Sequence, residues 1–259
     1  MTTKIHPTAV IGDRVEIADN VEIGPYCILE SDVTISEGTR LMAHVYVGCY
    51  TEIGKNNQVF PFTTLGVIPQ DLKFTGGRTN LVIGNDNVIR EHCSFHRGTE
   101  KGGGITKLGS RNLFMGSTHI AHDCQIGDDN IFSQAATLAG HVLIMNKTIL
   151  GGYSGVHQFC RLGNYAFVGG YSVITQDALP FVKAVGNRAK NYGINSIGLE
   201  RQGFAKEDIR DLQKAYRILF QKKLRMQEAL QQLKENYADS AKVMELVDFI
   251  ESSERGIIH

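Results

Sequence analysis

Apolar residues recur at every sixth position through the first two thirds of the chain. Steps of six from Ile5 meet an aliphatic residue eleven times in succession, up to Leu65. The same phase returns between residues 83 and 95, and a second phase holds for twelve steps from Leu108 to Ile174. A period of six fits neither the 3.6-residue helix nor the alternation of a hairpin meander. It predicts very short strands joined by tight turns and stacked as a solenoid.

Two further positions of the hexad have a consistent character. The residue after the aliphatic one is often glycine, which we expect to relieve the backbone at the turn. The residue four places after it is usually small or β-branched, and four of the five cysteines occupy this position: Cys27, Cys93, Cys124 and Cys160. This pattern predicts that these cysteines are small buried hydrophobic residues and not nucleophiles.

Two stretches interrupt the period, at residues 66–80 and 98–107. Loops that leave a regular solenoid tend to carry function. The second stretch contains Gly102, Gly103 and Gly104 but lacks the Gly-Lys-Ser/Thr of a phosphate-binding loop. We interpret it as a flexible loop.

The period changes to a helical one near Ser196. Apolar residues then recur at spacings of three and four, and Ser240 is placed as an N-cap. We therefore predict a β-helix domain over residues 1–190 and a helical domain over residues 191–259, which closes the last coil.

Composition and charge narrow the class of protein. The 259 residues include 27 Lys plus Arg and 27 Asp plus Glu, so the net charge gives no support to nucleic-acid binding. The start does not resemble a signal peptide, and no apolar run is long enough for membrane insertion. Five cysteines without a C-x-x-C pair suggest neither a disulfide framework nor a cysteine zinc site. These features favour a soluble cytoplasmic protein.

Histidines are the candidate chemical groups. His122, His141 and His157 are separated by 19 and 16 residues. If a coil contains about 18 residues, they stack on one wall of consecutive coils, with His119 just upstream. A row of imidazoles suits either metal binding or proton transfer.

Several segments resemble one family closely and in order along essentially the whole chain. They are Gln70–Lys73, His96–Thr99, Gly102–Lys107, His119–Cys124, Leu138–Val142, Val156–Cys160 and Arg201–Phe204. The sequence is similar to the UDP-N-acetylglucosamine O-acyltransferases, the first enzymes of lipid A synthesis. The resemblance implies an all-β solenoid, a left-handed parallel β-helix of hexapeptide repeats, followed by a C-terminal α-helical domain. It also implies a homotrimer with the active site between subunits and no cofactor or bound metal.

The same resemblance implies a reaction and roles for individual residues. The family transfers a 3-hydroxyacyl chain from acyl carrier protein to the 3-position of the sugar of UDP-N-acetylglucosamine. His122 matches the general base, Asp123 its supporting carboxylate and Gly140 the backbone donor to the oxyanion. Asp123 can alternatively bond backbone at a turn, and Gly140 can be a turn glycine. The substrate-binding positions implied are Asp71, Lys73, His119, His141, His157, Gln158, Asn195 and Arg201.

Details of specificity follow less directly. Ile197 and Gln202 stand where Glu and Arg are common in the family, so the details of nucleotide binding stay open. The acceptor stays open too: it can be the 3-amino sugar nucleotide, which would give an amide product. Gly170 matches the position where a bulky side chain would shorten the acyl-chain groove, and Arg188 falls near it. This predicts a longer acyl chain, although Gly170 can instead serve packing.

A basic stretch suggests a protein partner. Residues 183–225 contain eleven Lys and Arg against four acids. This stretch suits docking of the acidic acyl carrier protein, or is an ordinary solvated helix surface. Two alternatives to the acyltransferase remain: a zinc hydratase of the γ-carbonic anhydrase type, which binds zinc with three histidines in a similar fold, and a non-enzymatic scaffold.

Overall fold

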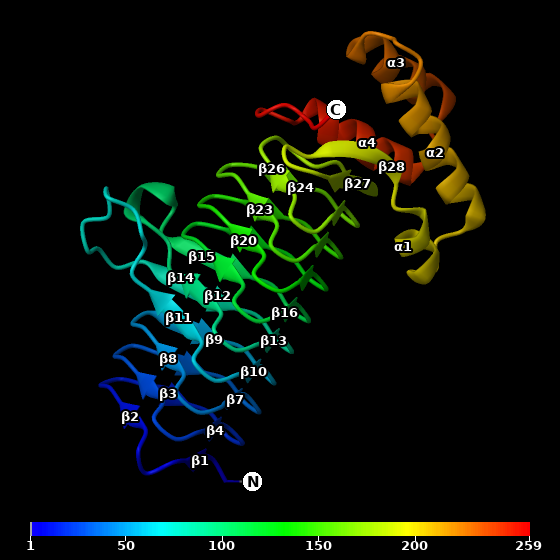
Figure 1. Ribbon diagram of the computed structural model, residues 1–259. Coiled ribbons are helices and arrows are strands. Elements are labelled where there is room, and N and C mark those ends of the chain that lie inside the picture. Colours follow the sequence, from blue (N-terminus) through cyan, green and yellow to red (C-terminus); the bar gives the residue numbers. More distant parts are fainter. Residues whose placement is uncertain (1) are drawn as a thin grey trace.

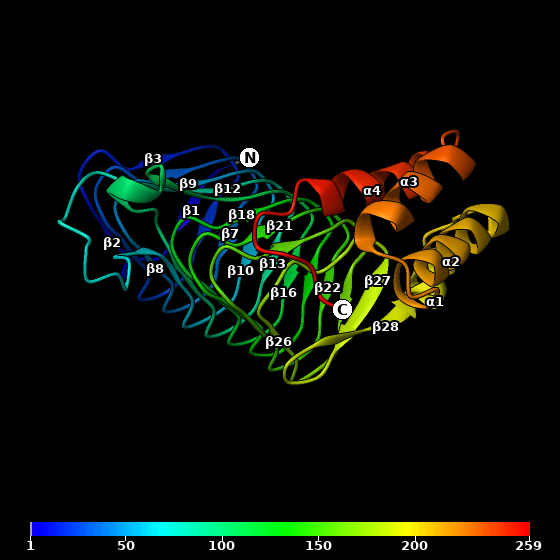
Figure 2. The same ribbon diagram turned by 90° about the horizontal axis from the view of Figure 1, so that it is seen from above.

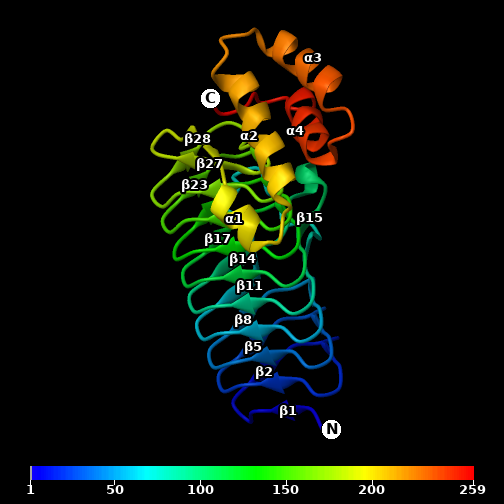
Figure 3. The same cartoon turned by 90° about the vertical axis from the view of Figure 1, so that its right-hand side faces the viewer.

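The computed structural model describes residues 2–259. Every predicted hexad forms a short strand, and the strands build three parallel sheets that form the sides of a long coil (Figures 1 and 3). The first sheet contains, in order, β1 (Lys4–Ile5), β4 (Glu22–Ile23), β7 (Arg40–Leu41), β10 (Gln58–Val59), β13 (Val88–Ile89), β16 (Leu113–Phe114), β19 (Ile131–Phe132), β22 (Ile149–Leu150), β25 (Phe167–Val168), β27 (Val182–Val185) and β28 (Lys190–Ile194). Only the last pair, β27 and β28, is antiparallel.

The other two sheets have the same parallel construction. The second contains β2 (Val10–Ile11), β5 (Ile28–Leu29), β8 (Tyr46–Val47), β11 (Thr64–Val67), β14 (Ser94–His96), β17 (His119–Ile120), β20 (Thr137–Leu138), β23 (Gly155–Val156) and β26 (Val173–Ile174). The third contains β3 (Glu16–Ile17), β6 (Thr34–Ile35), β9 (Thr51–Ile53), β12 (Asn80–Ile83), β15 (Ile105–Leu108), β18 (Gln125–Ile126), β21 (Leu143–Ile144) and β24 (Arg161–Leu162).

A coil length of 18 residues, on which the expected histidine stack depended, is confirmed. Lys4 pairs with Glu22, 18 residues further on, and this register continues along the solenoid. The two irregular stretches lengthen two coils, so that Gln58 pairs with Val88 and Val88 with Leu113. The architecture is a left-handed parallel β-helix with a helical C-terminal part, as predicted.

The hexad residues fill the axis of the solenoid. From Ile23 to Ile174 they are almost completely buried. Ile5 and Ile11 are 46% and 37% exposed because they belong to the first coil, which no earlier coil covers. The four cysteines predicted to be buried are buried, and burial raises the pKa of Cys124 to about 12. The thiols therefore contribute to packing.

The explanation offered for the hexad glycines was wrong. Of those immediately after the aliphatic position only Gly66, which opens the first irregular stretch, has a positive φ. Elsewhere the left-handed residues come two places later and are mostly not glycine, as at Tyr26. A Cβ on Gly24 would lie 2.8 Å from the carbonyl carbon of Met42 in the next coil. Glycine is required there because successive coils approach closely.

Four helices follow the β-helix and lie at its C-terminal end (Figures 1 and 2). They are α1 (Ser196–Arg201), α2 (Lys206–Phe220), α3 (Met226–Asn236) and α4 (Ala241–Glu251), and η1 (Glu100–Gly102) is a single 3-10 turn in the second irregular stretch. Ser240 is the N-cap residue of α4, as predicted, but its side chain makes no capping bond. The domain boundary predicted after residue 190 falls inside β28 and stays a prediction. No helix within residues 2–259 has the length and apolar character needed to cross a membrane.

Candidate active site

His122 and Asp123 lie at a corner between the second and third sheets, in the turn that follows β17. Asp123 has a left-handed φ of 61°, which turns the chain and brings two neighbouring side chains to the same side. The Nδ1 atom of His122 lies 2.7 Å from Oδ2 of Asp123. An ionised carboxylate only accepts, so the Nδ1–H group donates, and in the neutral imidazole this leaves Nε2 unprotonated. The ring therefore presents a free base.

Asp123 is fixed by the second irregular stretch. The backbone N–H and the hydroxyl of Thr99 donate to its two oxygens, at 2.8 Å and 2.7 Å. The side chain of Asp123 is only 1% exposed, and both of its oxygens accept hydrogen bonds, as expected for a buried carboxylate. The same carboxylate therefore contacts His122 and accepts from backbone near the turn, so the two roles considered for Asp123 do not exclude each other. Thr99 is a site residue that its position in the His96–Thr99 segment could have revealed.

One glycine of the Gly-rich stretch, Gly102, is required by packing. A Cβ on Gly102 would collide with the carboxylate of Asp123. Gly102 also donates its N–H to the Thr99 hydroxyl, at 3.1 Å. The interpretation as a flexible loop missed this packing against the candidate catalytic carboxylate.

Gly140 lies one coil beyond His122. Its φ is outside the left-handed region, so the backbone turn does not require glycine. A Cβ would lie 2.6 Å from Cε1 of His122, so the absence of a side chain makes room for the imidazole. The N–H of Gly140 donates no hydrogen bond within residues 2–259 and is free to serve an external acceptor.

The predicted stack of three histidines is only partly correct. His141 lies over Asp123, not His122; its ring centre is 5.2 Å from that of His122, and its Nε2 is 3.6 Å from Asp123 Oδ2. Phe159 stacks on His141 at 4.6 Å. Asp123, His141 and Phe159 follow one another at 18-residue intervals, and His157 comes two positions before Phe159. His157 instead contacts Arg255 through Nδ1, at 2.8 Å. The spacings of 19 and 16 differ from the coil length of 18, and each difference moves the residue to another register position.

A second pair of histidines extends the site toward the N-terminus. His119 contacts the Ser94 hydroxyl through Nδ1 at 2.7 Å, and its ring lies 4.8 Å from that of His96. Burial lowers the pKa of His119 and lowers that of His96 to about 4, so both rings stay neutral near pH 7. Ser94 and His96 line a cleft of about 690 Å³ that also includes Gln70 of the first irregular stretch. His96 was not predicted as a site residue, although it belongs to the His96–Thr99 segment.

The other predicted residues lie apart from this corner. Asp71 and Lys73 are in the loop between β11 and β12, where Asp71 accepts from the Lys73 N–H at 2.9 Å. Asn195 and Arg201 share a groove of about 410 Å³ with Ile197 at the start of the helical part. Within residues 2–259, neither pair bonds to a histidine of the corner.

Three further predicted residues are exposed. Gln158, which follows His157, is exposed, as are Gly170 and Arg188. A Cβ on Gly170 would meet Gly152 O at 3.4 Å, an ordinary contact, and its φ is outside the left-handed region. Packing within this chain does not require glycine at position 170.

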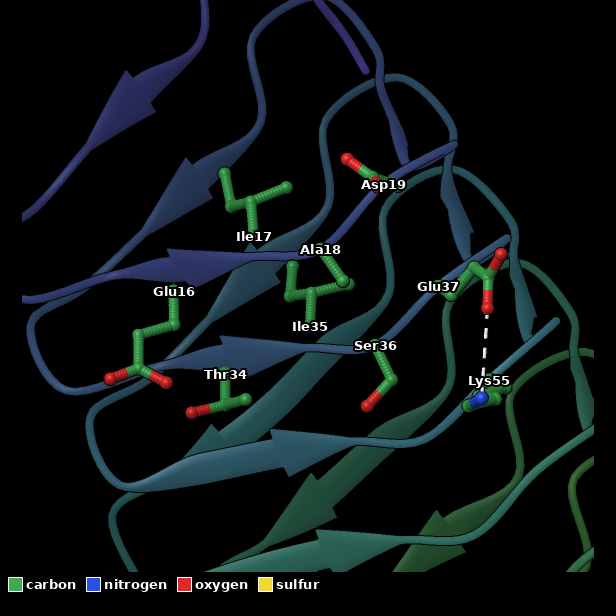
Figure 4. A pocket seen from close by; sticks show the side chains of 9 residues that line it. All are labelled: Glu16, Ile17, Ala18, Asp19, Thr34, Ile35, Ser36, Glu37 and Lys55. Carbon is green, nitrogen blue, oxygen red and sulfur yellow. Dashed lines mark ion pairs between the residues drawn. The ribbon is translucent and has the colours of Figure 1, made fainter. Parts of the chain in front are cut away.

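A hollow near the N-terminus has a different character. It lies on β3 and β6, and its lining includes Glu16, Asp19 and Glu37, with Lys55 at its edge (Figure 4). The Glu37–Lys55 ion pair, at 3.6 Å, is more than half exposed. Surface pairs of this kind contribute little. No histidine is among the residues that line this hollow.

The corner also has the donor atoms for a metal. Among residues 2–259, the potential ligand atoms of His122, Asp123 and His141 lie within 4.8 Å of one another. His157, the third histidine of the zinc alternative, is not in this group. Two imidazoles and a carboxylate could bind a transition metal, so the zinc hydratase stays open to test.

Comparison with known proteins gives consistent results. Residues 2–37 match the family model for the bacterial transferase hexapeptide, six repeats, and residues 177–258 match that for UDP-N-acetylglucosamine O-acyltransferase, domain 2. The acyl-[acyl-carrier-protein]–UDP-N-acetylglucosamine O-acyltransferase of Thermodesulfovibrio yellowstonii is 48% identical over 98% of both chains. The solved LpxA structure from Acinetobacter baumannii has a TM-score of 0.96 at 48% identity, covering 98% of this chain and 99% of that one.

A second solved structure agrees over the full length. UDP-N-acetylglucosamine O-acyltransferase (LpxA) from Moraxella catarrhalis is 45% identical, with a TM-score of 0.96 and complete coverage of both chains. The hexad solenoid and the His122–Asp123 corner, together with these matches, define a hexapeptide-repeat acyltransferase. More narrowly, the chain belongs to the UDP-N-acetylglucosamine O-acyltransferase family.

Proposed function

We propose that this protein transfers a 3-hydroxyacyl chain from acyl carrier protein to the 3-hydroxyl of UDP-N-acetylglucosamine, the first step of lipid A biosynthesis. Membership of the family supports the reaction class. The observation that carries the mechanism is the 2.7 Å contact between His122 Nδ1 and Asp123 Oδ2. It leaves Nε2 of His122 as the acceptor for the proton of the sugar hydroxyl.

The chemistry proceeds by addition and elimination. His122 Nε2 takes the hydroxyl proton as the sugar oxygen forms a bond to the thioester carbon. The thioester oxygen becomes negative, and the free N–H of Gly140 donates to it. When the intermediate collapses, the carbon–sulfur bond breaks, and the thiol of the carrier leaves with the proton that His122 returns. No cofactor takes part.

Asp123 keeps the base in the right orientation. It accepts from His122 and, through Thr99, is tied to the second irregular stretch. The carboxylate also stabilises the imidazolium formed during the reaction, as expected for a carboxylate adjacent to a base.

We propose that substrate contacts come from several chains of a homotrimer. Asp71 and Lys73, on an exposed loop, and Asn195 and Arg201, in the groove near α1, are separate from the His122 corner in one chain. The fully exposed side chain of Leu72 at the loop tip favours burial against another subunit. His119, His141, His157 and Gln158 would contact the sugar and diphosphate from the β-helix side.

The acyl chain would follow a groove past Gly170 and Arg188. Because packing does not require glycine at position 170, its small size is available for the ligand. We propose a longer acyl chain on this basis. A hydroxyl or an amine group at the sugar 3-position could each give a proton to His122. The 3-amino sugar nucleotide is therefore the alternative acceptor.

Acyl carrier protein would dock on the basic surface. The side chains of Lys206, Arg210, Lys214 and Arg217 on α2 are exposed. An acidic partner would be attracted to them over long range. All five cysteines are free thiols, which fits the reducing cytoplasm where we place the reaction.

The decisive experiment combines substrates with variants. Purified protein is offered both sugar nucleotides with a ladder of 3-hydroxyacyl carrier proteins, and product is measured by mass spectrometry. His122→Ala should lower kcat about 10²–10⁴-fold with the oligomer intact. His44→Ala, at an exposed ring remote from the corner, is the matched control. Turnover like that of wild type in His122→Ala would remove His122 as the base.

Metal analysis tests the zinc hydratase. Stoichiometric zinc, with activity lost to chelators and restored by zinc, would favour the hydratase and contradict the acyltransferase mechanism. Full acyl transfer in the presence of chelator would exclude a catalytic metal at His122, Asp123 and His141.

A further inference from the structure

The C-terminal segment, residues 252–259, returns from α4 to the last coils of the β-helix (Figure 1). There Nη2 of Arg255 lies 2.8 Å from Nδ1 of His157, although the two residues are 98 positions apart in sequence. The Nε–H of the same guanidinium donates to the carbonyl of Thr175 at 3.0 Å. One arginine therefore joins the end of the chain to the coil that follows His157.

This contact favours one position for the proton on the His157 ring. Arginine has five N–H donors and no acceptor, so the Nδ1 atom facing it must offer a lone pair. The same Nδ1 lies 3.1 Å from the carbonyl oxygen of Gln158. This oxygen can accept a hydrogen bond from Nδ1 only if Nδ1 carries a proton. The shorter Arg255 contact and the carbonyl contact thus demand opposite tautomers. A guanidinium at 2.8 Å favours the tautomer with its proton on Nε2.

The segment on both sides of Arg255 is held in place by Asp177, through its buried carboxylate and its backbone. Ser253 donates to Oδ2 of Asp177 at 2.8 Å, and the N–H of Asp177 donates to the carbonyl of Gly256 at 2.9 Å. The N–H of Ile258 then donates to the Asp177 carbonyl at 3.0 Å. Asp177 itself is 1% exposed and paired with Arg161 at 2.9 Å. The guanidinium is therefore oriented before any substrate arrives.

The segment also shares a cavity with the site. Phe159, which stacks on His141, lines a space of about 490 Å³ together with Arg255 and Arg161. A continuous series of contacts leads from His122 to His141 and then to Phe159, which lines the cavity together with Arg255. The end of the chain is thus part of the surroundings of the proposed substrate site.

We propose that Arg255 is a positioning residue that holds His157 as the neutral Nε2–H tautomer, so that His157 donates a hydrogen bond to an oxygen acceptor of the substrate. This rests on the proposed function only in placing substrate beside His157. Loss of Arg255 releases Nδ1 to the Gln158 carbonyl, which moves the proton to Nδ1 and turns Nε2 into an acceptor.

The tautomer is measured first and without substrate. In ¹H–¹⁵N spectra of the full-length, histidine-labelled protein, the His157 signal is assigned by its loss in His157→Gln. We expect a protonated Nε2 in wild type and in His259→Ala, a matched control in the same tail, and a protonated Nδ1 in Arg255→Ala. An unchanged His157 signal in Arg255→Ala would overturn the proposal.

Kinetics then separate positioning from folding. Arg255→Ala should lower kcat/KM about 10-fold, the loss expected for one hydrogen bond to substrate, and Arg255→Lys should recover part of it because an ammonium can donate to Nδ1. In the His157→Gln background, Arg255→Ala should have no further effect. Equal losses with and without His157 would show a merely structural role and contradict the inference. If wild type fails to acylate UDP-N-acetylglucosamine, the proposed function fails, while the spectra still decide the tautomer.

Discussion

Gly140 and His122 are in such close contact that any side chain on residue 140 would displace the imidazole. A Cβ would lie 2.6 Å from Cε1 and 2.9 Å from Nε2 of His122. Glycine at this position thus serves the candidate base directly, in addition to offering its N–H.

Gly140→Ala should therefore inactivate without unfolding. The φ of Gly140 is compatible with alanine, so the backbone can stay in place while His122 moves. A displacement of about 1 Å costs about 100-fold in rate. Steady-state acyl transfer and a thermal melt are the measurements. Gly155→Ala, where a Cβ would have no heavy atom within 4 Å, is the control. A Gly140→Ala enzyme with normal kcat would show that His122 is not the base.

Gly170→Leu should shift the acyl-chain preference. The added side chain starts from an ordinary 3.4 Å contact with Gly152 O at an exposed position, so folding should be unaffected. If the groove passes this point, rates with long 3-hydroxyacyl donors should fall at least about 10-fold while short donors react normally. The ratio of kcat/KM for long and short donors decides this. An unchanged ratio would place the groove elsewhere.

Arg161→Met should destabilise the end of the β-helix. Arg161 pairs with Asp177, whose side chain is 1% exposed, and also donates to Ser252 and the Phe249 carbonyl of α4. Removing the cation leaves a buried carboxylate without its partner, at a cost of about 3–5 kcal/mol. Urea unfolding measures this. Arg111→Met, which breaks an exposed pair with Asp129, should change stability by less than about 1 kcal/mol. Similar losses in both variants would contradict the assignment of a buried pair.

His96 should make the protein less stable in acid. Burial lowers its pKa from 6.5 to about 4, so between these values the unfolded chain binds a proton that the folded chain does not. The free energy of unfolding therefore falls as the pH drops from about 6.5 to about 4. His96→Gln removes this contribution, so its stability should decline less steeply over the same window. Denaturant titrations at several pH values measure both slopes, and parallel curves would contradict the prediction.

The hexad pattern predicted the strands well because each side chain's environment depends on its place in the repeat. Ile23 and Leu41 are buried in the axis and Cys27 fills the small position, as the spacing indicated. The same pattern could not explain Gly24, whose role depends on the distance to Met42 in the next coil. The sequence shows which residues recur, but not how closely successive coils approach.

The candidate site shows the same division. The amino-acid sequence by itself determined the solenoid of short strands and the helical end, since these follow from local periodicity. The 18-residue coil and the pairing of His122 with Asp123 came from the family resemblance, because a six-residue period does not set the number of hexads in a coil. Only the tertiary structure placed Thr99 on Asp123, Gly140 against His122 and Arg255 on His157. It also moved His157 out of the predicted stack, because irregular spacings shift register in a helix of fixed coil length. Contacts between distant residues depend on register and on loop paths, which a repeat pattern does not specify.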